Sequence, residues 1–321
     1  MQAQMISEYG GVEVLTLSDV ATPVPGRGEI RVRVAYVSLN PIEWKIRSGA
    51  FAAMLPMTFP IILGNEVSGV VDQLGQDVEG FQVGDRVAGF VRGGGDAEYV
   101  LTTPDRVAVV PDALSLRSAA VLPQGVETAR RSLGLLKVAP GQTVVVNGAA
   151  GSVGSAAVQI LVEQGVTVIG TASARNHDYL RSLGASPVEY GEGLLDQLAA
   201  AAPHGIDAAL DCGAHGFVDQ ALTVLPAERI ITVADFSAGA KGVQLAGGDP
   251  LDLYADSFRS MLPRAAEGRF TTEVAAEFPL ADLASAQTMS ETGHLRGKIL
   301  VRVAHLDGED TGHSPVGVSG A

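Results

Sequence analysis

The stretch from Val144 to Ile160 reads VVVNGAAGSVGSAAVQI, and this run decides the fold of the region around it. Its first residues are apolar and β-branched, which is typical of a buried strand. Glycines follow at Gly148, Gly151 and Gly154, and an apolar stretch with the character of a helix comes after them. Such a turn lets the backbone approach a phosphate closely, and the N–H groups at the helix start face the anion. The stretch therefore predicts a pyrophosphate site of the kind that holds a nicotinamide dinucleotide.

Composition limits the kind of protein and its partners. The chain has 321 residues, 46% hydrophobic and 18% charged, which predicts a compact protein with room for two domains. Its formal net charge of −14 argues against a nucleic-acid or anionic-membrane partner. The only cysteine is Cys212, so we expect no disulfide framework and a reducing, cytoplasmic location. We see neither a signal peptide at Met1–Gln4 nor an apolar run long enough to span a bilayer.

The first third of the chain has the pattern of β structure. Apolar and polar residues alternate over Ile30–Tyr36, as they do in a strand with one buried face. Further short apolar segments are separated by turn-forming glycines and cover Val67–Leu74, Arg86–Phe90 and Ala97–Leu101. Strands of this length and spacing predict a partly closed barrel or a sandwich.

From about residue 123 the pattern changes to alternating strands and helices. We expect strands over residues 143–147, 166–171, 186–190, 207–211 and 229–234. Helices are expected over residues 152–164, 176–183, 194–202 and 217–224. This alternation predicts a doubly wound parallel sheet with helices on both faces, which binds its ligand at the carboxyl ends of the strands.

The last part of the chain is expected to return to the first domain. It shows a predicted helix over residues 251–267, a strand over 270–278, a helix from Ala281 and a strand over 298–303. The tail from His305 is rich in Gly, Asp and Ser, which predicts mobility. We therefore predict a discontinuous domain of residues 1–122 and 266–321 around a nucleotide-binding domain of residues 123–265.

Several short motifs stand in a recognisable order along this chain. They read SLNPIEWK over residues 38–45, GNEVSGVV over 64–71, GDRV over 84–87, AEYV over 97–100, NGAAG over 147–151 and RGKI over 296–299. In this order and spacing the chain resembles the zinc-free quinone oxidoreductase branch of the medium-chain dehydrogenases/reductases. The resemblance implies an α/β fold, in which a Rossmann domain is joined to a mostly β, GroES-like barrel domain.

Metal distinguishes this branch from the zinc alcohol dehydrogenases of the same fold. Those enzymes carry a Gly-His-Glu motif, but here Asn65 stands in place of its histidine, and Cys212 lies in the nucleotide domain. A catalytic zinc needs three protein ligands, so we expect no metal site. Without a Lewis acid, conjugate hydride addition to an enone or quinone is easier than reduction of a simple carbonyl, because hydrogen bonds can stabilise an enolate. Glu66 is expected to form structural hydrogen bonds.

The end of the second predicted strand of the nucleotide domain suggests which cofactor binds. NAD-specific folds usually place a carboxylate there, whereas this chain has Ser173 and Arg175. A hydroxyl and a guanidinium suit a 2′-phosphate, although Arg175 could also be a solvent-facing residue. The resemblance adds Tyr190 to the adenosine-phosphate pocket. NADPH is the expected cofactor.

Asn40 and Lys45 are the candidate catalytic residues that the resemblance points to. Asn40 can donate a hydrogen bond to a substrate oxygen or to the cofactor, or it can cap a helix that begins at Pro41. Many related reductases have tyrosine close to the position of Lys45. A lysine there could polarise an enone or supply a proton, or it could lie on a solvated helix face.

The resemblance also implies a wider set of cofactor contacts. Besides Asn40, Ser173, Arg175 and Tyr190, this set comprises Gln124, Thr128, Gly148, Ala149, Ala150, Gly151, Ser152, Val153, Gly154, Cys212, Gly213, Ala234, Phe236, Arg296 and Lys298.

The expected function is NADPH-dependent hydride transfer to a quinone or to the C=C bond of an α,β-unsaturated carbonyl. One alternative is an enoyl reductase dedicated to a single biosynthetic intermediate, for example a polyketide. Another, from a different class, is a non-catalytic NADPH-binding sensor. We expect an apolar edge strand over Gly242–Ala246, which could pair with the same strand of a second chain. Related reductases commonly dimerise in this way, so we predict a homodimer.

Overall fold

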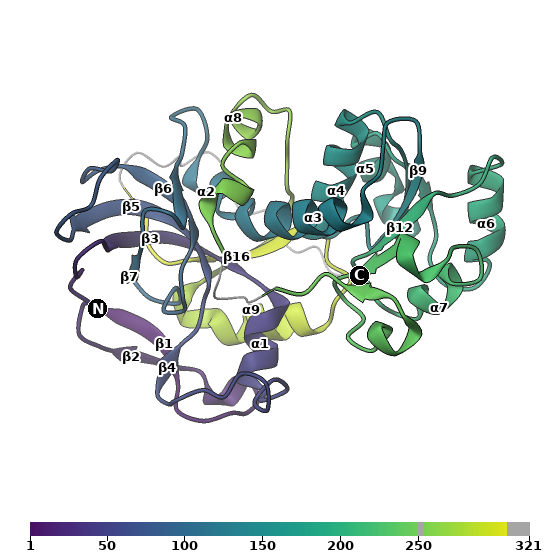
Figure 1. Cartoon of the computed structure of the whole chain (residues 1–321). Helices are drawn as coiled ribbons and strands as arrows, with labels where there is room; N and C mark the ends of the chain where they lie inside the picture. The colour runs from purple at the N-terminus through teal and green to yellow at the C-terminus, as the bar shows by residue number, and fades with distance from the viewer. Residues whose placement is uncertain (249–252, 307–321) are drawn as a thin grey trace.

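The computed structural model describes residues 1–248 and 253–306. It arranges them in two lobes, one built around a parallel sheet and the other around a mixed sheet (Figure 1). Helix α3 (Pro123–Leu136) lies between the two lobes (Figure 1), and strand β16 (Lys298–Arg302) belongs to the mixed sheet. The predicted combination of a Rossmann domain and a GroES-like domain is confirmed.

The parallel sheet has the strand order β11-β10-β9-β12-β13-β14, and every neighbouring pair is parallel. Its strands are, in chain order, β9 (Thr143–Asn147), β10 (Thr167–Thr171), β11 (Ser186–Val188), β12 (Ala208–Asp211), β13 (Ile230–Thr232) and β14 (Gln244–Leu245). The helices that alternate with these strands are α4 (Ser152–Glu163), α5 (His177–Ser182), α6 (Leu194–Ala201) and α7 (Phe217–Ala221).

Strand β9 shows why helices cover both faces of this sheet. Its valines are buried, and successive side chains of a strand point to opposite faces. Val144 and Val146 share a core cluster with residues of α3 and α4, whereas Val145 packs with residues of α6 and α7. A continuous apolar run is therefore required here, as expected for a parallel sheet buried on both sides.

The mixed sheet has the order β15-β16-β3-β5-β6-β8, and β7 also pairs with β3. Its strands are β3 (Ile30–Leu39), β5 (Glu66–Leu74), β6 (Arg86–Phe90), β7 (Tyr99–Thr102), β8 (Val107–Val109), β15 (Val274–Pro279) and β16. Strand β16 pairs antiparallel with β3, so the chain returns to its first lobe as predicted. A small sheet of β1 (Gln2–Ile6), β2 (Thr16–Asp19) and β4 (Ile61–Ile62) lies beside the N-terminus (Figure 1). The remaining helices are α1 (Pro41–Arg47), α2 (Leu116–Ala120), α8 (Met261–Ala266) and α9 (Leu283–Glu291).

Two glycines at the turn between β9 and α4, Gly148 and Gly154, cannot be replaced without strain. Gly148 has a φ of +69°, a left-handed conformation that costs other residues energy. A Cβ on Gly154 would lie 2.3 Å from the carbonyl oxygen of Gly148, so only glycine lets the first turn of α4 pack so closely. Both residues confirm the turn that the sequence predicts.

Several predicted boundaries are wrong by a few residues or more. The predicted helix over 251–267 is reduced to a 3₁₀ turn at Ala255–Ser257 and to α8, and residues 251 and 252 lie outside the described residues. Backbone pairing explains part of this difference, because the N–H of Ala255 bonds to the carbonyl of Asp105 in the first lobe. The predicted mobile tail falls outside the described residues from 307 onward.

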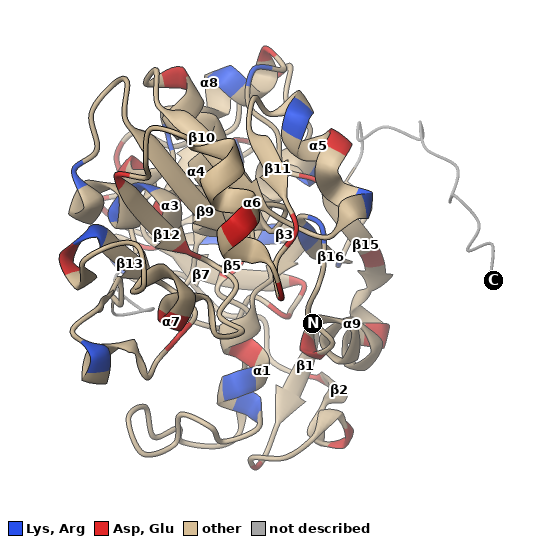
Figure 2. Cartoon of the chain, turned by 90° about the vertical axis from the view of Figure 1, so that its right-hand side faces the viewer, with Lys and Arg blue, Asp and Glu red and all other residues tan. Residues whose placement is uncertain are grey.

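The surface carries charges of both signs. Acidic and basic segments are interspersed over α5, α6 and α8 (Figure 2). None of the helices within residues 1–248 and 253–306 has the length and apolar character that crossing a membrane requires.

Candidate active site

Two adjoining cavities open at the carboxyl ends of the parallel strands. The larger has a volume of about 690 Å³ and the smaller about 450 Å³. Both are lined by the glycine turn at Gly148 and Gly151 and by Cys212 and Gly213 after β12. The cavities therefore meet at the turn that the sequence predicts as a pyrophosphate site.

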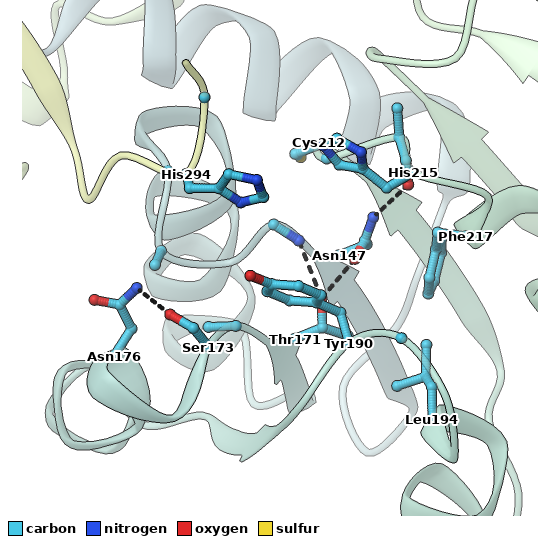
Figure 3. Close-up of a pocket in the computed structure, with 18 of the residues that line it drawn as sticks. Asn147, Thr171, Ser173, Asn176, Tyr190, Leu194, Cys212, His215, Phe217 and His294 are labelled. Carbon is cyan, nitrogen blue, oxygen red and sulfur yellow. Dashed lines mark hydrogen bonds between the residues drawn. The ribbon is translucent and has the colours of Figure 1, made fainter. Parts of the chain in front are cut away.

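The smaller cavity is framed by a buried polar network beneath the glycine turn (Figure 3). Asn147 donates to the Asp211 carboxylate at 2.8 Å and accepts a bond from the Thr171 hydroxyl at 2.5 Å. Asp211 also accepts bonds from the N–H groups of Gly213 and Ala214. This network ties the ends of β9, β10 and β12 together, so the cavity walls are held rigid before a ligand arrives.

An aromatic stack in the smaller cavity escaped the sequence analysis. His294 stacks on His215 with ring centroids 5.5 Å apart, and Tyr190 stacks on His294 at 6.2 Å (Figure 3). His215 and His294 both have φ values near +57°, uncommon for residues other than glycine. They come from distant segments, so no local pattern reveals their pairing. Tyr190 lies beyond the end of β11, which stops at Val188, so its predicted strand position is wrong.

The predicted phosphate-binding residues separate into two groups. Ser173 lines the smaller cavity with Gly148, Ala150 and Gly151, and its hydroxyl accepts a bond from Asn176 at 3.2 Å. Arg175 lines neither cavity, and its guanidinium donates to the carbonyl of His294 at 3.1 Å.

Two further predicted contacts also lie outside both cavity linings. Ala149 is fully buried within the glycine turn. Arg296 lies over the ring of Tyr179, 5.4 Å from its centroid.

The larger cavity brings together most of the other predicted residues. Its lining includes Asn40, Lys45, Gln124, Thr128, Ser152, Val153, Gly154, Ala234, Phe236 and Lys298. It also includes Arg131, for which the sequence carries no signal; Arg131 pairs with Glu127 at 2.7 Å one turn earlier on α3.

Lys45 lies half-buried between aromatic rings. Its ammonium is 5.0 Å from the ring centroid of Phe236 and 5.5 Å from that of Trp44. Burial lowers the pKa of Lys45, because leaving water disfavours the charged form. Lys45 therefore lies in the wall of the larger cavity and not on a solvated helix face.

Asn40 caps helix α1, which is one of the two roles that the sequence left open; donation to a substrate or to the cofactor stays a prediction. It is the N-cap residue of α1, with Pro41 at the first helical position. Its amide nitrogen also donates to Glu66 at 3.0 Å and to Asn65 at 3.1 Å, and its amide oxygen accepts a bond from Lys298.

Glu66 is the centre of this polar cluster and makes the structural hydrogen bonds expected of it. Lys298 Nζ lies 2.7 Å from Glu66 Oε2, and the N–H of Gln124, in the first turn of α3, donates to Glu66 Oε1 at 2.8 Å. The side chains of Lys298 and Glu66 are only 4% and 0% exposed. The carboxylate is thus held between an ammonium and a helix N-terminus, both of which favour negative charge.

Two more carboxyl groups lie buried behind this cluster. Glu43 accepts a bond from the N–H of Asn40 at 3.3 Å, and burial, reinforced by Asp96, raises the pKa of Glu43 well above its usual value. Burial raises the pKa of Asp96 to about 7. The sequence gives no signal for this pair, because each residue alone has the pattern of an ordinary loop or helix residue.

Cys212 lies where the two cavities meet. Burial raises the pKa of its thiol well above the usual value, and the neighbouring Asp211 carboxylate adds to the effect. The thiolate is the reactive form of cysteine, and a raised pKa makes it scarce. Cys212 is therefore better suited to form part of the cavity wall than to act as a nucleophile.

Comparisons with known families agree with this architecture. The family model described as "Alcohol dehydrogenase GroES-like domain" matches residues 26–112, and the one described as "Zinc-binding dehydrogenase" matches residues 183–301. A dehydrogenase of Monascus ruber, pigH, is 39% identical over 198 residues, and the trans-enoyl reductase himH of Aspergillus japonicus is 37% identical over 203. These alignments cover 54% and 57% of this chain and 54% and 58% of the relatives, so the chain matches little more than half of their length.

Solved structures match over nearly the whole chain, among them the following two. The quinone oxidoreductase of Coxiella burnetii is 30% identical with a TM-score of 0.84, covering 95% of this chain and 99% of that one. A mycobacterial protein solved with NADPH is 27% identical with a TM-score of 0.81, covering 94% and 100%. The chain belongs to the quinone oxidoreductase branch of the medium-chain dehydrogenase/reductase superfamily.

Proposed function

We propose that this protein transfers hydride from NADPH to a quinone or to the C=C bond of an α,β-unsaturated carbonyl, without zinc. The observation that carries the proposal is the meeting of the two cavities at the glycine turn. A dinucleotide bound there can run from Ser173 in the smaller cavity towards Asn40 and Lys45 in the larger one. The mycobacterial neighbour solved with NADPH supports this choice of cofactor.

The larger cavity supplies what conjugate reduction requires. A bound dihydronicotinamide supplies the hydride. The protein must then stabilise negative charge on the substrate oxygen and deliver a proton to carbon or oxygen. Lys45 and Lys298 bring N–H donors to this cavity, and the rings of Trp44 and Phe236 supply apolar wall.

The donor set near Glu66 suits an ammonium better than zinc. Lys298 is already hydrogen-bonded to Glu66 and Asn40, and its positive charge would repel a divalent cation placed beside it. Among the described residues, no group of three or more His, Cys, Asp or Glu side chains is placed to hold a metal. We expect elemental analysis to find no stoichiometric zinc and chelators to leave activity intact; about one tightly held zinc per chain would contradict this.

The decisive experiment follows NADPH oxidation spectrophotometrically with a panel of quinones, enones, simple aldehydes and ketones. Turnover is expected with quinones and enones only, because a simple carbonyl gives a localised alkoxide that hydrogen bonds stabilise poorly. NADPH binding without turnover of any compound would favour the non-catalytic sensor instead. Mass spectrometry with deuterated NADPH would show whether the label reaches the β-carbon.

A second candidate is an enoyl reductase dedicated to one biosynthetic intermediate. The similarity to the trans-enoyl reductase of Aspergillus japonicus favours it. The chemistry is the same, so the breadth of the panel distinguishes the two: a dedicated enzyme should leave small enones nearly unreacted.

A further inference from the structure

The ammonium of Lys298 has hydrogen-bonding capacity that its known contacts do not exhaust. A lysine ammonium carries three N–H donors. Among the described residues, Lys298 Nζ has two acceptors, Glu66 Oε2 and Asn40 Oδ1. Lys298 lines the larger cavity, and no acceptor among the described residues takes its third donor.

Asn40, by contrast, has its amide group engaged. Its two amide N–H groups are shared among three acceptors, the carbonyl of Ser38, Asn65 Oδ1 and Glu66 Oε2, at 3.0 to 3.2 Å. Its amide oxygen accepts from Lys298. Binding a substrate oxygen through Asn40 would therefore break existing buried bonds, which is costly, whereas binding it through Lys298 breaks none.

The backbone fixes Lys298 beside the nucleotide site. The N–H of Gly297 donates to the carbonyl of Ala150 in the glycine turn at 3.0 Å. The N–H of Lys298 donates to the carbonyl of Glu273 at 2.9 Å. Gly297 has a φ of +79°, and a Cβ there would lie 1.9 Å from the oxygen of Glu273. The segment can dock only with glycine at this point, and docking it delivers the next side chain into the cavity wall.

We propose that Lys298 is the catalytic residue that binds the substrate oxygen as negative charge develops on it, and that Asn40 and Glu66 position its ammonium. The proposal rests on the proposed reductase function. When hydride reaches the β-carbon of an enone, the C=C electron pair moves and the carbonyl oxygen becomes an enolate, which the third N–H of Lys298 stabilises. Protonation of the α-carbon, by Lys45 or by water, then restores the carbonyl and releases the saturated product.

The position of this cation explains how the site can work without a Lewis acid. A charged donor acts strongly on an oxyanion inside a buried, fixed setting, because no solvent must reorganise when the charge appears. The N-terminal turn of α3 holds the Glu66 carboxylate, and this carboxylate holds the ammonium of Lys298 in place.

The test uses variants designed to fold. Lys298→Met alone would leave Glu66 buried without its cation, so it is combined with Glu66→Gln, which removes the opposite charge at the same time. Arg302→Met is the matched control, because Arg302 lies on the same strand, pairs with Glu277 and lines neither cavity. Far-ultraviolet circular dichroism and NADPH titration establish that each variant is folded and binds cofactor.

The first readout is enone reduction. We expect the double variant to lose about 10²–10³-fold in kcat at saturating NADPH, since an oxyanion donor acts mainly after the substrate has bound. A loss of NADPH affinity with kcat retained would identify Lys298 as the cofactor contact that the resemblance implies and would overturn the proposal. The Arg302→Met control should keep the wild-type rate. A wild-type kcat in the double variant would overturn the proposal while leaving the reductase function intact.

The second readout does not depend on turnover. 4-Nitrophenol is titrated into each protein saturated with NADP⁺, and its absorbance reports the fraction bound as phenolate, which mimics the enolate. Wild type and Arg302→Met should raise this fraction above that of the free phenol at the same pH, and the double variant should not. Equal phenolate fractions in all three proteins would overturn the role of Lys298. Failure of the wild type to reduce any quinone or enone would instead remove the proposed function.

Discussion

Lys45 is an ammonium held against aromatic rings, and burial lowers its pKa. A lowered pKa makes an ammonium a better proton donor near neutral pH. We expect Lys45→Met to lower kcat for enone reduction by about 10²–10⁴-fold with little change in NADPH binding. Steady-state kinetics and a cofactor titration measure the two effects separately.

Lys137→Met is the control for Lys45, because Lys137 ends helix α3 on the surface and lines neither cavity. It should behave as the wild type. If Lys45→Met also kept the wild-type rate, solvent would be the proton source.

We expect Asp96 to make the stability of the protein depend on pH. Its pKa is raised by burial to about 7, whereas the unfolded chain should ionise near pH 4. Between these values the folded state binds more protons than the unfolded state. The free energy of unfolding contributed by this group therefore falls as the pH rises from about 4 to about 7, by at most about 1.4 kcal/mol per pH unit, and levels off above.

Asp96→Asn should reduce this slope and make the protein more stable than the wild type at pH 8, because asparagine carries no charge to bury. Urea unfolding at a series of pH values between about 5 and 8 measures the free energy of unfolding and its slope with pH. The exposed Asp112→Asn variant should retain the wild-type slope. A slope equal in Asp96→Asn and wild type would show that Asp96 does not hold its proton.

Among the elements, the 3₁₀ turn at Ala174–Asn176 lies where the sequence predicts recognition of the 2′-phosphate. Arg175 is exposed there, and its bond to the His294 carbonyl can be exchanged for a phosphate. We expect Arg175→Ala to weaken NADPH binding about ten- to a hundredfold, roughly 1.5–3 kcal/mol for a charge-assisted contact, and to leave NADH binding nearly unchanged. Fluorescence titration with both cofactors provides the measurement.

Arg181→Ala is the matched control for this turn, since Arg181 is an exposed arginine on the adjoining helix and pairs with Asp178. It should leave both affinities unchanged. An equal loss for NADPH and NADH in Arg175→Ala would show that Arg175 does not distinguish the phosphate.

At the scale of the whole molecule, β14 is an edge strand of the parallel sheet, as the sequence predicts. An edge strand offers backbone groups to a second copy, and we expect a homodimer that pairs these edges. Light scattering at micromolar concentration should give the mass of two chains. The Gln244→Lys variant, which places like charges at the paired edges, should shift the mass towards one chain.

Ser186→Lys, on the opposite edge strand β11, is the control and should remain dimeric. A monomeric wild type, or equal effects of the two lysines, would contradict pairing through β14.

The sequence by itself determined the nucleotide-binding lobe in most of its detail. The apolar run of β9, the glycines at 148 and 154 and the alternation of strands and helices are local signals, because they concern residues that are neighbours in the chain. Strands β6 and β9 were predicted to the residue. The wrong predictions concern the ends of elements, such as the end of β11 near Tyr190 and the start of α8. At these places pairing with distant segments decides how far an element extends.

Only the tertiary structure decided which polar side chains contact one another in the larger cavity. The resemblance points to Asn40 and Lys298 as site residues, but Lys298 is separated by 258 residues from Asn40 and by 232 from Glu66, so no local pattern predicts that the three form one cluster. The stack of His215 on His294 and the buried pair of Glu43 and Asp96 arise in the same way. Hydrogen bonds and burial change what a side chain can do only when the chain has closed around it, so the chemistry of this cluster is a property of the folded molecule.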